Sequence, residues 1–100
     1  MLYLIEEVDL KTNKNINVLY FYSTNMIFYR RIKNILQELQ KKYKKIICYA
    51  INANNFKNLC GRFFIESVPT IVIFKDGIEV ERVNNQIFQS EIDSIIKNII

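Results

Sequence analysis

The only thiols of this chain belong to Cys48 and Cys60, and the sequence contains no histidine. A thiolate is the nucleophile of disulfide exchange, and histidine is the side chain that most often activates it. Cys48 lies between Ile47 and Tyr49 in an apolar run, and Cys60 follows Leu59. Because apolar burial raises the pKa of a thiol and makes it unreactive, we predict two structural cysteines and no catalytic residue. A thiol–disulfide oxidoreductase that uses Cys60 or Cys48 stays open as the alternative.

Neither a metal site nor a cofactor is predicted. Structural zinc sites need four nitrogen or sulfur ligands, which two cysteines without histidine do not supply. Such sparse use of cysteine favours the reducing cytoplasm over an oxidising compartment. The segment 1–7 lacks the basic start of a signal peptide, and the longest apolar runs, 18–22 and 71–74, are too short to cross a bilayer. We therefore expect a cytoplasmic protein without a membrane partner.

The elements that position these residues follow from the hydrophobic pattern. The 100 residues, half of them apolar, suit one domain that spans residues 1–100. Strands are predicted at 2–8, 17–22, 46–51, 71–75 and 78–83, with an Asp76-Gly77 hairpin turn between the last two. Helices are predicted from the caps at 23–25 to the lysines at 41–45, at 54–64, and over a C-terminal face of Phe88, Ile92, Ile95, Ile96 and Ile99. This order predicts a three-layer α/β fold, in which helices cover both faces of a central mixed β-sheet.

The segment 21–29 joins a buried strand to the longest predicted helix. Its last four residues are apolar and lie at the start of the helix, where part of the cluster should stay exposed. A contiguous exposed apolar patch usually marks an interaction surface. We predict that Met26 and Ile27 form such a patch beside Val68. The alternative is that the aromatic pair at 28–29 turns inward as core.

Three residue patterns together resemble the thioredoxin family. The run 18–22, a four-residue slot and Arg30-Arg31-Ile32 resemble its active-site strand and helix. Val68-Pro69-Thr70 resembles its cis-proline loop, and Phe74-Lys75-Asp76-Gly77 resembles the hairpin that follows. The resemblance covers residues 17–100 and implies a thioredoxin-like fold whose first helix is reduced to a loop. It also implies that Pro69 is cis and that the backbone of Val68 pairs with an extended bound peptide.

At the chemically important positions the sequence departs from that family. Dithiol exchange needs a thiolate of low pKa at a helix N-terminus and a second thiol three residues later. Met26 and Tyr29 occupy these two positions, Tyr20 occupies that of the buried acid, and Ala50 occupies that of a lysine near the acid. These departures predict a redox-inactive thioredoxin-like protein that is not an enzyme.

The stretch 58–70 is similar to the thioredoxin-like domain of phosducin-like proteins, including a cysteine shortly before an arginine and the Val-Pro-Thr sequence. That resemblance implies protein partners, in a larger complex or a chaperone system. The predicted function is a binding module, adaptor or subunit that holds an extended segment in the former active-site groove. Its partner-binding residues are predicted to be Asn25, Met26, Ile27, Phe28, Val68, Pro69, Thr70, Asn84 and Asn85.

A second candidate surface is basic. The helix that follows residue 29 and the turn after it carry seven cations, opposed there only by Glu38: Arg30, Arg31, Lys33, Lys41, Lys42, Lys44 and Lys45. With a formal net charge of +4, nucleic acid or an acidic partner is an open alternative. We do not favour nucleic acid, because no recognised motif accompanies the cations and the aromatic residues lie mostly in strands. A solvated helix face is favoured, and a structural subunit that docks through this basic helix is a further alternative.

Overall fold

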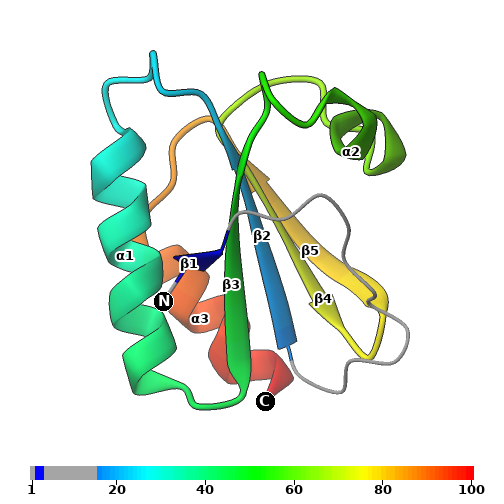
Figure 1. Cartoon of the computed structure of the whole chain (residues 1–100). Coiled ribbons are helices and arrows are strands. Elements are labelled where there is room, and N and C mark those ends of the chain that lie inside the picture. The colour runs from blue at the N-terminus through cyan, green and yellow to red at the C-terminus, as the bar shows by residue number, and fades with distance from the viewer. Residues whose placement is uncertain (1, 4–15) are drawn as a thin grey trace.

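Five strands form one mixed sheet in the order β1-β3-β2-β4-β5 in the computed structural model, which describes residues 2–3 and 16–100 (Figure 1). Both β1 and β2 run parallel to β3, whereas β4 is antiparallel to β2 and β5 is antiparallel to β4. The strands are β1 (Leu2–Tyr3), β2 (Ile16–Tyr22), β3 (Ile46–Asn52), β4 (Thr70–Lys75) and β5 (Ile78–Asn84). Most of the strand predicted at 2–8, and the loop predicted to replace a first helix, lie outside the described residues.

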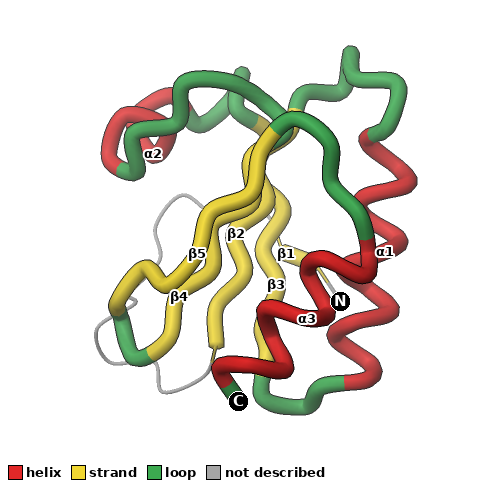
Figure 2. Tube along the Cα trace, turned by 180° about the vertical axis from the view of Figure 1, so that it is seen from behind, coloured by secondary structure: helices red, strands yellow, loops and turns green. Residues whose placement is uncertain are grey.

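Three helices cover the sheet: α1 (Tyr29–Lys42), α2 (Lys57–Arg62) and α3 (Gln89–Ile99). Figure 2 shows α1 and α3 gathered on one side of the strands and α2 on the other. The predicted α/β class, a central mixed sheet with helices on both faces, is confirmed. Within the described part of the chain, no helix is long and apolar enough to cross a membrane.

The two faces of the sheet carry separate cores because side chains alternate along each strand. On β2, Val18 and Tyr20 face α1 and α3, whereas Leu19 and Phe21 face α2. Every residue of β2 is buried, as expected for a central strand that is covered on both faces. The buried position of β2 therefore determines where the turn between β2 and α1 lies.

The helix α1 begins later than predicted. The Ser23 carbonyl accepts a hydrogen bond from the Met26 N–H (3.0 Å), and the Ser23 hydroxyl accepts from the Asn25 N–H (3.3 Å). These bonds close a local turn in place of a helix cap. The helix starts only at Tyr29, and Phe28, which was predicted to bind a partner, lies before it and is 57% exposed.

The helix α2 is also shorter than the predicted span 54–64. At its start, Asn52 accepts three hydrogen bonds from main-chain N–H groups. Its side chain accepts from Asn54 (3.0 Å), and its carbonyl accepts from Asn55 (3.0 Å) and Phe56 (3.2 Å). This is a turn that asparagine forms readily. At the other end Phe64 has a φ of 55°, the left-handed conformation that terminates helices.

Candidate functional site

The predicted site residues come from three distant segments that meet at one end of the sheet. The register pairs Phe21 with Thr70, and Thr70 with Asn84, so the ends of β2, β4 and β5 lie side by side. The turn before α1, the segment before β4 and the segment between β5 and α3 all lie at this end (Figure 1). Asn25, Asn84 and Asn85 are exposed there.

The apolar residues at 26–28 divide between core and surface. Met26 is half-buried and packs against the core under α1 and α3. Ile27 is 90% exposed, and Phe28 is 57% exposed. The ring of Tyr29 stacks on that of Tyr22, with centroids 4.5 Å apart. The exposed apolar surface therefore consists of Ile27 and Phe28, whereas Met26 contributes mainly to packing.

Arg31 connects this surface to the segment before α3. Its guanidinium carbon lies 5.4 Å from the centre of the Phe28 ring, and its Nη2 donates a hydrogen bond to the Ile87 carbonyl (3.1 Å). The next residue, Phe88, is 52% exposed, although the sequence pattern placed it on the buried face of the last helix. The signal that could have revealed it is its place directly before the polar start of α3. Ile27, Phe28 and Phe88 are called the sheet-end patch below.

The peptide bond between Val68 and Pro69 is cis, the isomer that the family resemblance implies. Val68 is half-buried and packs against the core under α2. Thr70 is buried, and its hydroxyl donates to the Ser67 carbonyl (2.7 Å). The side chain of Thr70 therefore stabilises the loop.

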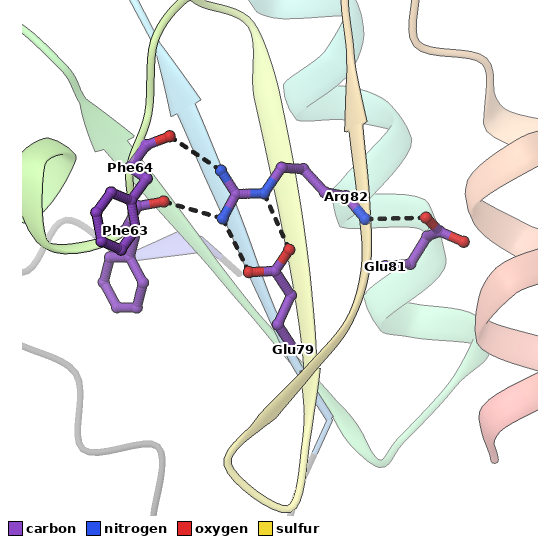
Figure 3. Close-up of polar contacts among 5 residues, drawn as sticks. All are labelled: Phe63, Phe64, Glu79, Glu81 and Arg82. Carbon is purple, nitrogen blue, oxygen red and sulfur yellow. Dashed lines mark hydrogen bonds and ion pairs between the residues drawn. The ribbon is translucent and has the colours of Figure 1, made fainter.

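Arg82 holds the segment that leads to this loop (Figure 3). Its guanidinium donates to the carbonyls of Phe63 (2.9 Å) and Phe64 (3.1 Å), and it forms two hydrogen bonds with the Glu79 carboxylate (3.0 and 2.8 Å). The bonds to Glu79 raise the pKa of Arg82, so the cation persists at all accessible pH values. Sequence reasoning missed this contact because its partners are main-chain carbonyls.

Tyr20 is fully buried beneath the turn, at the position of the family's buried acid. Its hydroxyl donates to the Tyr29 carbonyl at 3.3 Å. Burial, reinforced by the neighbouring Tyr29 and Tyr22, raises the pKa of Tyr20 well above its usual value, and Arg31 opposes this only in part. The phenol therefore stays neutral. Ala50, at the position of the family lysine, is buried as well.

The two cysteines differ in accessibility. Cys48 is fully buried in β3, its Sγ lies 3.8 Å from the Leu36 carbonyl, and burial raises the pKa of its thiol to about 12. Cys60 is only partly buried, contrary to the sequence-based prediction, and burial raises the pKa of its thiol as well. The Sγ of Cys60 lies 3.9 Å from the carbonyl of Ala53, whose N–H donates to the Tyr22 carbonyl (2.8 Å). Cys60 is therefore the thiol near the sheet end.

Two hollows flank the sheet end. One of about 780 Å³ is lined by residues 54–59 and Arg62 at α2. The other, of about 440 Å³, is lined by Tyr29, Arg30, Lys33, Asn34 and Gln37 on α1. Among the described residues, no group of three or more histidine, cysteine or acidic side chains could hold a metal ion.

The arrangement is similar to that of solved thioredoxins. A mutant thioredoxin from Halobacterium salinarum superposes with a TM-score of 0.86 over 96% of this chain and 88% of its own, at 19% identity. An oxidised thioredoxin from Arabidopsis thaliana gives a TM-score of 0.85 over 98% and 93%, at 18% identity. A chloroplastic M-type thioredoxin from Zea mays is 33% identical over 72 residues, which are 71% of this chain and 43% of that relative. The chain thus spans less than half the length of this curated relative.

These comparisons overturn the prediction that the chain is not an enzyme. That prediction depended on the substitution of the two family cysteines by Met26 and Tyr29, but the relatives are thioredoxins, which are oxidoreductases. The two thiols of the chain lie at positions 48 and 60 instead, and the substitution does not remove the chain from this family. The family model described as Thioredoxin matches residues 6–98, and the chain therefore belongs to the thioredoxin family.

Proposed function

We propose that this thioredoxin-family protein binds an extended segment of a protein substrate at the sheet-end patch. The observation that carries the proposal is the exposure of Ile27 and Phe28 where three strand ends meet. Adjacent exposed apolar side chains usually mark an interaction surface. Thioredoxins act on proteins, which supports a protein as the bound partner.

The backbone of Val68 supplies a second element of such a site. No hydrogen bond of its N–H or carbonyl is found within the described part of the chain. Unpaired main-chain groups favour a partner strand that satisfies them. The proposed segment therefore pairs with Val68 while its apolar side chains contact Ile27 and Phe28.

The test uses Ile27→Asp, with Ile78→Asp as a matched control. Both isoleucines are exposed, at 90% and 68%, but Ile78 lies in β5 next to the hairpin turn, far from the sheet end. We expect peptides selected from a random library on the parent protein to bind Ile27→Asp at least about tenfold more weakly, because a desolvated carboxylate opposes apolar contact. Fluorescence anisotropy gives the Kd values. Equal affinity for the parent protein and Ile27→Asp would show that the peptides bind elsewhere.

A second candidate function is thiol–disulfide exchange through Cys60. It is favoured by the partial exposure of this thiol and by its place beside Ala53, near the end of β2. In such a reaction the Cys60 thiolate attacks a substrate disulfide and forms a mixed disulfide while one substrate thiol leaves. An external dithiol then releases Cys60 and the second substrate thiol.

The two thiols should react at very different rates in the folded protein. We expect one thiol per chain to react with an aromatic disulfide reagent at least about a hundredfold faster than the other, because thiolate fraction and access both favour Cys60. Cys60→Ser should lose the fast phase and any reduction of insulin by dithiol, whereas Cys48→Ser should keep both. A fast phase that survives in Cys60→Ser would contradict the assignment.

We also propose a cellular location and a class of partner. We place the protein in the cytoplasm, since both cysteines are free thiols. The similarity of residues 58–70 to phosducin-like proteins supports a partner in a larger complex or chaperone system, and a complex isolated with the tagged full chain would identify it.

A further inference from the structure

We propose that the protein segment bound at the sheet-end patch is acidic where it passes α1, with its carboxylates held by Arg30 and Lys33. This inference rests on the proposed function, because it describes the continuation of the same bound segment. The hollow of about 440 Å³ on α1 begins at Tyr29, the residue directly after Phe28. A segment that leaves the patch along α1 therefore enters this hollow.

Among the residues that the structure describes, no carboxylate neutralises the cations of the hollow. Other cations of α1 are engaged: Lys41 lies 3.5 Å from Glu38, Lys42 lies 3.0 Å from Asp93, and Arg31 is bonded to a carbonyl. Neither Arg30 nor Lys33 has a carboxylate partner within the described part of the chain. Two unpaired charges on one wall attract an anion.

The start of α1 adds to this positive potential. The first turn of the helix contains no acidic residue, and no side chain among the described residues caps it. The positive end of the helix dipole is therefore not compensated and has the same sign as Arg30 and Lys33. Asn34 and Gln37, on the same wall, carry amide N–H groups that donate to carboxylates.

The same wall argues against nucleic acid as the occupant. A single-stranded nucleic acid needs open aromatic faces on which its bases stack. The Tyr29 ring is already covered by Tyr22, with centroids 4.5 Å apart, and by Lys33, whose Nζ lies 6.0 Å from the ring centre. The hollow offers charge and amides without a stacking platform, which suits Asp and Glu side chains of a protein.

The experiment compares two versions of the tightest library peptide, with three glutamates or three glutamines beside its apolar residues. The proteins are the parent, Arg30→Gln/Lys33→Gln, and a control with the same loss of charge beyond the far end of α1, Lys44→Gln/Lys45→Gln. At low salt we expect the parent to bind the glutamate peptide about fivefold more tightly. This preference should vanish in Arg30→Gln/Lys33→Gln, persist in the control, and shrink at about 0.5 M salt.

Each outcome separates the two proposals. Equal binding of both peptides by the parent, with both weakened by Ile27→Asp, would overturn the acidic preference and leave the patch in place. If neither peptide binds, this inference fails together with the proposed function. An oligothymidylate that binds the parent and loses affinity in Arg30→Gln/Lys33→Gln, while the glutamate peptide does not, would assign the surface to nucleic acid instead.

Discussion

A thiol introduced at position 26 by Met26→Cys/Tyr29→Cys should have a pKa near 7, below the usual value of about 8.5. Position 26 lies just before α1, and its carbonyl accepts a hydrogen bond from the N–H of Tyr29 (3.5 Å). The uncompensated helix dipole stabilises a thiolate there, against a smaller opposing effect from the partial burial of Met26. At pH 7 we expect alkylation about tenfold faster than that of Cys60, because the larger thiolate fraction outweighs the lower intrinsic nucleophilicity.

The measurement is the rate of iodoacetamide alkylation against pH for Met26→Cys/Tyr29→Cys in a background of Cys48→Ser/Cys60→Ser. The Cys48→Ser variant supplies the rate of Cys60 for comparison. Met26→Cys/Tyr29→Cys should reduce insulin faster than the parent protein. Met26→Cys alone should accumulate mixed disulfides with the substrate, because it lacks the second thiol. A titration midpoint at or above about 8.5 would show that the turn before α1 does not stabilise a thiolate.

At pH 7 the carboxyl group of Tyr20→Asp should destabilise the fold by about 4 kcal/mol beyond the cost of the cavity, a large share of the 5–15 kcal/mol typical of small proteins. The site is fully buried, so desolvation raises the pKa of a carboxyl there above its unfolded value of about 3.9. A raised folded pKa means that stability is present below the unfolded pKa and is lost as pH rises. The loss is about 1.4 kcal/mol per pH unit until the folded pKa is passed, and Arg31 reduces it in part.

Urea unfolding of Tyr20→Asp between pH 4 and pH 8 checks this slope. Tyr20→Asn provides the control, since it creates a similar cavity and polar group without a titrating charge, and its deficit should not vary with pH. Tyr20→Phe removes only the 3.3 Å hydrogen bond to Tyr29 and should cost about 1 kcal/mol or less. A deficit in Tyr20→Asp that is independent of pH would mean that the site is hydrated.

Local sequence signals were sufficient to predict the strands of the sheet. The Asp76-Gly77 pair has φ values of 53° and 80°, which this dipeptide adopts easily. The apolar run 18–22 of β2 reflects its burial on both faces. The start of α1 could not be predicted, because Ser23, Thr24 and Asn25 are equally competent caps. None of them caps the helix, because the Ser23 hydroxyl accepts from the Asn25 N–H (3.3 Å) and from the side chain of Asn54 (3.4 Å), a partner distant in sequence.

The candidate site was predicted less completely than the fold. Helical spacing groups Phe88 with Ile92, but Phe88 is in an extended conformation before α3 and stays exposed. Cys60 was placed with Leu59 in the core, but in the short α2 only Leu59 is buried. Phe88 lies before its helix, and the six residues of α2 are too few for periodicity to determine the direction of Cys60.

Arg82 has a consequence for how the molecule opens. Its guanidinium is bonded to the carbonyls of Phe63 and Phe64, which precede it by 19 and 18 positions in the sequence. The chain between the bonded residues contains β4. The edge strand β5 and the segment that leads from Phe63 to Pro69 therefore cannot open separately, since movement of either one breaks the same contacts of Arg82. They form one cooperative opening unit, and the rigidity of the loop before β4 is set at the opposite edge of the sheet from β1.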